Sequence, residues 1–220
     1  MNGKEVALDV VTFETGPLQE NAYLLIDRET RDAVIVDPGD DGQQLIAAIE
    51  ERGVGLRAIW LTHAHFDHIG AVRALRTRFS VPAWLHEADI PMFEAGPYQA
   101  ASYGLPFDGD EPPTERFREG QGLSIGGLSF TVMHTPGHSP GHVTIHGNGV
   151  ALVGDCLFAG SIGRTDLPLG NGAELQRSLL RIVALPPETR VLPGHGPATT
   201  VAEERRTNPF ILDVLARVPR

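Results

Sequence analysis

Four metal-binding side chains directly after an apolar segment constrain this chain more than any other feature. Residues 58–61 have the apolar composition of a buried strand, and the next seven residues read Thr-His-Ala-His-Phe-Asp-His. Crowding polar groups at a strand end has no packing benefit, and burying them unpaired would cost roughly 1–3 kcal/mol each. The pattern predicts a metal site whose first candidate ligands are His63, His65, Asp67 and His68.

The spacing of these residues indicates two ions rather than one. Four imidazole and carboxylate groups exceed what one tetrahedral ion could use while it keeps a position open for substrate. If the chain stays extended, His63 and His65 project to the same side, because strand side chains alternate. A turn at the following residues would carry Asp67 and His68 to a neighbouring point. We expect one pair to hold each ion, and such ligands suit a divalent metal such as zinc.

Three strand-like segments later in the chain each end in a further ligand candidate. In two of them a glycine directly precedes the acid or the imidazole, so the backbone can approach a neighbour closely there. In the third, a proline and a glycine force a turn just after the histidine. The three candidates are His134, Asp155 and His195.

This series of motifs resembles the metallo-β-lactamase superfamily. After the first motif come His-Thr-Pro-Gly-His-Ser, Gly-Asp-Cys-Leu-Phe and Pro-Gly-His-Gly, and together the motifs span residues 62–196. The resemblance implies an α/β fold, a four-layer αββα sandwich with two mixed sheets between outer helices. It also implies that one ion is held by His63, His65 and His134, that the other is held by Asp67, His68 and His195, and that Asp155 bridges both.

Within the superfamily, residues 154–168 are most similar to those of the glyoxalase II-like hydrolases. That likeness implies two divalent ions, zinc first and iron or manganese as alternatives. It also implies hydrolysis of a thioester of the hydroxyacylglutathione type, or of a related acyl compound, by hydroxide held between the ions. Asp67 and Asp155 are then the catalytic carboxylates.

Two other functions remain open. The chain also resembles the persulfide dioxygenases, which use one iron held at positions that match His63, His134 and Asp155. A metal-binding scaffold without turnover, kept for a partner protein, is the third hypothesis. The intact ligand set argues against the scaffold, because a scaffold has no reason to leave an open position on its metal.

The expected substrate contacts differ from those of authentic glyoxalase II. That enzyme has a helical C-terminal domain and a tyrosine shortly after the last ligand histidine, whereas Pro197 and Ala198 stand there in this chain. Arg164 lies near the place of a basic glutathione contact in the family, where it could hold an anionic group of the substrate. The irregular stretch 86–122 offers Tyr98, Tyr103 and Phe107 either as walls of the substrate pocket or as side chains that only pack against the fold.

The remaining histidines and the single cysteine are expected to support the site rather than to form it. His138 is the best candidate for a residue that contacts a metal ligand, and Cys156 is expected to be a small buried side chain rather than a soft ligand. The other histidines of this kind are His86, His142 and His146.

Composition narrows the partners to small molecules. The chain has 220 residues, and 28 acidic against 18 basic side chains give a net charge of −10, which argues against a nucleic-acid partner. One cysteine excludes an internal disulfide, and the sequence contains neither an apolar signal segment nor a stretch long enough to cross a bilayer. We expect a cytoplasmic protein with a single domain over residues 1–220.

A coarse reading of hydrophobic periodicity predicts strands and helices in mixed order. Residues 86–122, interrupted by proline and glycine, are expected to form a short helix and an irregular excursion. The predicted strands cover residues 6–13, 21–26, 33–36, 58–61, 123–125, 128–134, 142–147, 150–153 and 190–192, and the predicted helices cover 43–52, 69–76, 172–184 and 201–216.

Overall fold

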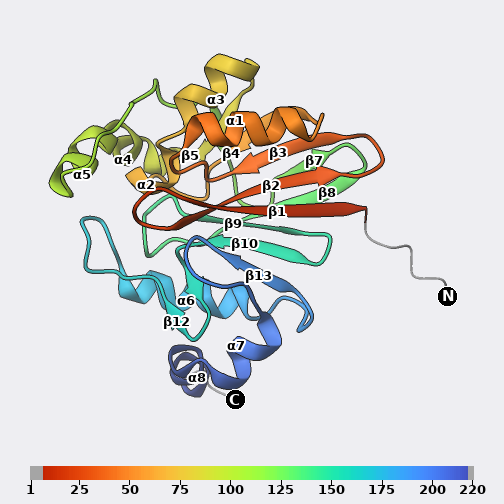
Figure 1. Cartoon of the computed structure of the whole chain (residues 1–220). Helices are drawn as coiled ribbons and strands as arrows, with labels where there is room; N and C mark the ends of the chain where they lie inside the picture. Colours follow the sequence, from red (N-terminus) through yellow and green to blue (C-terminus); the bar gives the residue numbers. More distant parts are fainter. Residues whose placement is uncertain (1–6, 218–220) are drawn as a thin grey trace.

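Two six-stranded mixed sheets lie face to face at the centre of the molecule (Figure 1). The computed structural model describes residues 7–217. In spatial order the first sheet consists of β1 (Leu8–Thr15), β2 (Glu20–Asp27), β3 (Asp32–Val36), β4 (Gly55–Trp60), β5 (Ala83–His86) and β6 (Glu115–Phe117). The second sheet consists of β14 (Thr199–Thr200), β13 (Arg190–Pro193), β10 (Val150–Gly154), β9 (Val143–Gly147), β8 (Leu128–His134) and β7 (Gly122–Ile125), and a separate hairpin joins β11 (Leu157–Phe158) to β12 (Ser161–Ile162).

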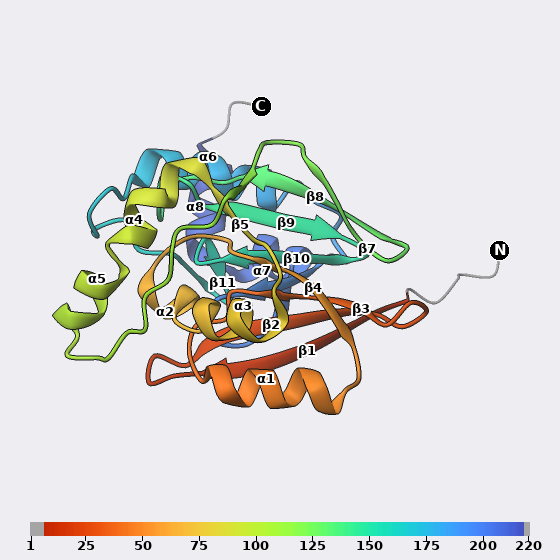
Figure 2. The same ribbon diagram turned by 90° about the horizontal axis from the view of Figure 1, so that it is seen from above.

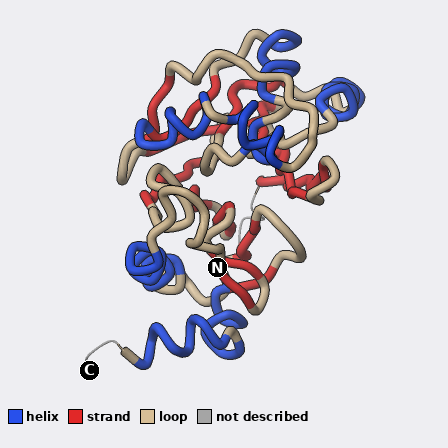
Figure 3. Tube along the Cα trace, turned by 90° about the vertical axis from the view of Figure 1, so that its left-hand side faces the viewer, coloured by secondary structure: helices blue, strands red, loops and turns tan. Residues whose placement is uncertain are grey.

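Helices cover the outer face of each sheet, so the molecule has four layers (Figures 1 and 3). One buried apolar cluster lies between the two sheets. A second lies between the first sheet and its helices, and a third lies between the second sheet and its helices. This arrangement confirms the predicted αββα sandwich. Over the first sheet lie α1 (Gly42–Glu51) and α3 (Val72–Phe79), and over the second lie α6 (Gly172–Ile182), α7 (Val201–Thr207) and α8 (Pro209–Ala216).

Side-chain periodicity explains the burial of these elements. Every residue of β2 is buried, as expected for a strand covered on both faces. In α1 the residues that face the sheet are Leu45, Ile46 and Ile49, which are the three predicted from the sequence. Burying side chains of this size contributes roughly 1.5–3 kcal/mol each.

Two predicted helices are interrupted in the structure. The helix expected over 69–76 is divided into α2 (Phe66–Ile69) and α3, although Ile69, Val72 and Leu75 are all buried as predicted. The helix expected over 201–216 ends before Asn208, whose side chain accepts hydrogen bonds from the first backbone N–H groups of α8. Pro209 follows, and because proline favours the first position of a helix, a new helix starts there.

The stretch 86–122 contains more regular structure than the sequence predicted. A 3₁₀ turn, η1 (Glu87–Asp89), leads into α4 (Ile90–Glu94) and α5 (Gly96–Ser102), and the chain then returns to the first sheet as β6. The short strands β5 and β6 were not predicted, because three or four residues are too few to show a period. The first residue of the strand predicted over 6–13 lies outside the described residues.

The loops that follow β4, β8, β10 and β13 gather at one end of the sandwich, and this end carries the candidate site. In two perpendicular views α2, α4 and α5 lie at this end (Figures 1 and 2). The segment between β12 and α6 reaches the same end from the second sheet. Within residues 7–217, no helix has the length and apolar character needed to cross a membrane.

Candidate metal centre

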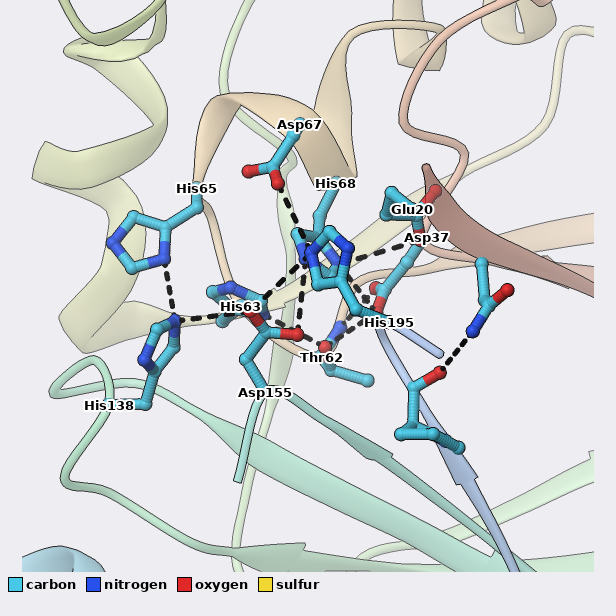
Figure 4. A network of polar contacts seen from close by, with 12 residues as sticks. Glu20, Asp37, Thr62, His63, His65, Asp67, His68, His138, Asp155 and His195 are labelled. Atoms are coloured by element: carbon cyan, nitrogen blue, oxygen red, sulfur yellow. Dashed lines mark hydrogen bonds and ion pairs between the residues drawn. The ribbon is translucent and has the colours of Figure 1, made fainter. Parts of the chain in front are cut away.

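The loop between β4 and α2 presents its four ligand candidates in two directions. The backbone is extended at His65, the N-cap residue of α2, with φ −67° and ψ 146°. The side chains of His63 and His65 point into the same space, where their ring centroids lie 4.9 Å apart. Asp67 and His68 lie in the first turn of α2, so their side chains point to a neighbouring space (Figure 4).

Two loops of the second sheet bring Asp155 and His195 to the same place. Asp155 follows β10, and its Oδ1 lies 3.4 Å from His68 Nε2. His195 follows β13, and its Nε2 lies 3.3 Å from Asp67 Oδ2 and 3.7 Å from Asp155 Oδ2. Asp155 is therefore within reach of the second group, which consists of Asp67, His68 and His195.

His138 completes the first group. Its Nε2 lies 2.8 Å from His65 Nδ1 and 3.6 Å from Asp155 Oδ2, and its ring centroid lies 5.0 Å from that of His63. The possible ligand atoms of His63, His65 and His138 all lie within 4.8 Å of one another. The sequence interpretation had placed His138 behind a ligand, but the structure places it among the potential ligands.

His134, the third ligand expected from the resemblance, does not reach this cluster. It is the last residue of β8, its Nε2 donates to Pro140 O at 2.9 Å, and its ring stacks on His86 with centroids 4.2 Å apart. Along β8 it alternates in phase with Val132, so its side chain continues the row that faces the first sheet. The chain turns only after His134, and that turn carries His138 into the cluster. His138 therefore replaces His134 in the first group.

The hydrogen-bond partners of the cluster fit bound cations. Although His68 Nε2 lies 3.4 Å from Asp155 Oδ1, neither atom makes a hydrogen bond, and His63 Nε2 has no partner either. These are three of the four buried side-chain nitrogen and oxygen atoms without a hydrogen-bond partner in residues 7–217. Buried polar atoms are rarely left unpaired, and imidazole and carboxylate groups are typical ligands of zinc and other divalent metals. The residues therefore fit a pair of divalent ions.

The protonation states of most of these groups also suit metal binding. Burial lowers the pKa of His63 well below its usual range, and the nearby His68 lowers it further. Burial, followed by the neighbouring His138, lowers the pKa of His65 to about 3. Burial alone would raise the pKa of Asp155, but His68 and His138 outweigh it, so that pKa is lowered. Neutral imidazoles and ionised carboxylates are the forms that bind metal ions.

His68 behaves differently because carboxylates surround it. Burial alone would lower its pKa, but Asp155 and Asp67 outweigh burial and raise the pKa well above its usual range. The surrounding carboxylates therefore stabilise the protonated form of the His68 imidazole. A cation bound there would release that proton.

Two buried carboxylates that the sequence interpretation missed lie behind His68. Asp37 accepts hydrogen bonds from Thr62 N and Thr62 Oγ1, each at 2.6 Å, and its Oδ2 lies 3.3 Å from His68 Nδ1. Glu20 Oε1 lies 3.6 Å from the same nitrogen. Asp37 directly follows β3, so it shows the same signal as Asp155, a carboxylate at the end of a buried strand.

Close approach explains the glycine before His195. A Cβ atom at Gly194 would overlap Asp155 Oδ1 and His68 Cε1. The backbone N–H of Gly194 donates to Gly154 O at 2.9 Å, and its carbonyl oxygen accepts from Asn21 N at 2.7 Å. Glycine thus lets the β13 loop lie directly against the cluster, as the sequence predicted.

The candidate substrate-binding residues lie on two segments at this end of the molecule. Tyr98 is 81% exposed and Tyr103 is 53% exposed, and the ring of Tyr103 lies 5.2 Å from that of Phe66 in α2. Arg164 makes a bidentate ion pair with Asp166, at 2.7 and 2.8 Å. Its guanidinium already has a carboxylate partner, so an anionic ligand would have to compete with Asp166.

Cys156 is fully buried, as expected from the sequence. Its Sγ donates to Thr135 O at 3.2 Å, and burial raises the pKa of the thiol well above its usual range.

Since the thiolate is the reactive form, we expect an aromatic disulfide reagent to leave Cys156 of the folded protein unmodified and to label one thiol per chain in denaturant. Absorbance of the released thiolate measures this, and rapid labelling of the folded protein would contradict the buried placement.

Comparison with known families agrees with this geometry. The model of the metallo-beta-lactamase superfamily matches residues 15–195. The chain belongs to this superfamily. A hydroxyacylglutathione hydrolase, GloC of Haemophilus influenzae, is 40% identical over 198 residues, which cover 88% of this chain and 93% of that protein.

Solved structures share this fold. The BLEG-1 B3 metallo-beta-lactamase is 41% identical with a TM-score of 0.87, and the match covers 92% of this chain and 99% of that one. TTHA1623 in a di-iron-bound form is 44% identical with a TM-score of 0.84, covering 91% and 100%. ETHE1 from Myxococcus xanthus is 28% identical with a TM-score of 0.77, covering 96% and 92%.

Proposed function

We propose that this protein is a dinuclear metal-dependent hydrolase that cleaves thioesters of the hydroxyacylglutathione type. The observation that carries the proposal is the convergence of two ligand groups on Asp155. The 40% identity to a hydroxyacylglutathione hydrolase supports the substrate class. In this proposal His63, His65 and His138 would hold one divalent ion, zinc first, Asp67, His68 and His195 would hold the other, and the carboxylate of Asp155 lies within reach of both groups.

The two ions would lower the pKa of a shared water and polarise the acyl carbonyl. The protein positions the substrate relative to them. The side chains of His195 and Asp67 are 28% and 16% exposed, whereas His63 and His68 are fully buried. The substrate therefore approaches from the side of His195 and Asp67. Water adds to the thioester carbon, the C–S bond breaks, and the products are a carboxylate, a thiol and one proton released to solvent.

Recognition of the substrate is proposed to centre on its acyl thioester. Phe158 lies beside His195, with ring centroids 6.3 Å apart, and the Phe66–Tyr103 pair lies on α2 and the end of α5. Phe158 therefore offers apolar surface beside one of the exposed ligands, and Tyr103, which is half-exposed, offers it next to α2. Because Asp166 occupies the guanidinium of Arg164, a carboxylate of glutathione gains that contact only by displacing Asp166.

Metal analysis combined with thioester hydrolysis tests the proposal. We expect about two divalent ions per chain and loss of absorbance of S-lactoylglutathione as its thioester bond is cleaved. A strong chelator should abolish this hydrolysis, and added zinc should restore it. A simple acyl thioester without glutathione, assayed in parallel, measures how much glutathione contributes to kcat/KM.

The same preparation distinguishes the alternatives. One iron per chain with oxygen uptake on glutathione persulfide would replace the proposal by the dioxygenase function. Hydrolysis of a chromogenic cephalosporin without thioester hydrolysis would replace it by a β-lactamase function, which the 41% identity to BLEG-1 makes a necessary control. Metal binding with no turnover of any of these substrates would support a scaffold.

A further inference from the structure

A buried carboxylate outside the two ligand groups connects the loops that carry the first group. Asp89 is the last residue of η1, directly after β5, and it is 0% exposed. Its Oδ2 accepts hydrogen bonds from Ala64 N at 3.2 Å and from Ser139 Oγ at 2.6 Å. Its Oδ1 accepts from Gly141 N at 2.5 Å. One side chain therefore has three partners in two loops.

The positions of these partners relate Asp89 to the first ligand group. Ala64 lies between His63 and His65, and Ser139 directly follows His138. The first loop extends from the first sheet and the second loop extends from the second sheet. Asp89 thus holds the His63–His65 segment and the His138 segment at a fixed separation, although it does not belong to the group itself.

Gly141 shows how closely this contact is packed. A Cβ atom at this position would lie 2.6 Å from Asp89 N and 2.8 Å from Asp89 Cγ. No side chain fits there without movement of the η1 backbone. The loop can approach Asp89 because residue 141 is glycine.

The second ligand group has supporting residues of its own in addition to those that it shares with the first. Asp37 and Glu20 lie behind His68, and Asn21 holds the His195 loop through Pro193 O and Gly196 O. None of the hydrogen bonds of Asp89 described above reaches that group. Asp37 also bonds Thr62, whose hydroxyl oxygen lies 3.1 Å from His63 Nδ1, so Asp37 supports both groups, whereas these hydrogen bonds of Asp89 reach only the loops of the first group.

We infer that Asp89 is a positioning residue that sets the affinity of the His63–His65–His138 site, and not of the second site, for its ion. The inference rests on the proposed pair of metal sites. The inference adds an asymmetry to that pair, since a change at Asp89 weakens the binding of one ion and not of the other. Residues that orient metal ligands typically contribute about 10–100-fold to metal affinity.

Asp89→Asn is the sharpest test. Asparagine has the same shape, but its amide has one acceptor oxygen, so the amide nitrogen must face the N–H of either Ala64 or Gly141. Titration of the metal-free protein with zinc against a chromogenic chelator should show one site weakened about 10–100-fold and the other unchanged. Ser139→Ala removes one hydrogen bond to Asp89 and leaves no buried donor without an acceptor, so it should weaken the same site less. This variant keeps the test decisive if Asp89→Asn does not fold.

Asp27 provides a matched control. It is 2% exposed and accepts from Glu29 N at 2.8 Å and from Gly127 N at 2.7 Å, so it also joins loops of both sheets. It lies at the end of β2 opposite Glu20. Asp27→Asn should lower the melting temperature of the metal-free protein and leave both zinc affinities unchanged.

Three results would overturn the inference. The first is wild-type zinc affinity at both sites in Asp89→Asn. The second is an equal loss of zinc affinity at both sites in Asp89→Asn. The third is a loss of zinc affinity at the first site in Asp27→Asn as large as the loss in Asp89→Asn. A wild-type protein that binds no ion, or binds ions without hydrolysing any thioester, would instead contradict the proposed function.

Discussion

Asp155→Asn is expected to lower kcat/KM for thioester hydrolysis by about 10³-fold, because several kcal/mol of electrostatic stabilisation would depend on the ions that this carboxylate is proposed to hold. Asp155 lies within 3.4–3.7 Å of His68, His138 and His195, so its carboxylate faces both ligand groups. Asparagine keeps the shape but loses the charge. Steady-state kinetics with metal analysis of the same sample measures the effect.

The control for this substitution is Asp27→Asn, which changes a buried aspartate at the far end of β2. We expect it to retain wild-type kcat/KM. A fall of less than tenfold in Asp155→Asn would show that this carboxylate is not required for turnover and would remove the main support for a dinuclear mechanism.

His138→Ala and His134→Ala form a pair that separates the structure from the sequence-based expectation. Since outer residues that merely orient ligands contribute up to about 100-fold, loss of a direct ligand should weaken one zinc site by at least about 100-fold. His138→Ala should show this loss, together with a comparable loss of hydrolysis. His134→Ala removes a ring that stacks on His86 and a hydrogen bond to Pro140 O. It should therefore cost stability, about 1 kcal/mol for the hydrogen bond, and leave both ions bound.

Chelator competition and thermal unfolding, carried out on both variants, measure these outcomes. The reverse pattern, with metal lost in His134→Ala and kept in His138→Ala, would contradict the placement of these two histidines. It would also restore the ligand set that the resemblance implied.

Most of the fold could be predicted from local patterns, because hydrophobic periodicity reflects which side chains of a helix or strand are buried. The inward residues of α1 and the strand segments that form the centre of each sheet could be predicted from periodicity alone. The division at Asn208 was harder to predict, although Asn208 and Pro209 together are a typical helix start. The short strands β5 and β6 exist through pairing with distant strands, and no window of four residues carries that information.

The candidate site was predictable where ligands lie close in sequence and less so where a turn decides. Alternation places His63 and His65 together, and the start of α2 places Asp67 and His68. The choice between His134 and His138 depends on where β8 ends, and the strand continues through the first of them. Asp89 could not be found from the sequence, because its partners are backbone and hydroxyl groups of loops 25 to 52 residues away.

The contact between β2 and the loop after β13 has a consequence for biosynthesis. Asn21 and Tyr23 bond the carbonyl oxygen of Pro193, so a strand made early in translation holds the loop that carries His195. In a nascent chain, the side chains of Asn21 and Tyr23 lack these partners until residues 193–196 have been synthesised. The second ligand group is therefore complete only after the loop that carries His195 has docked on β2.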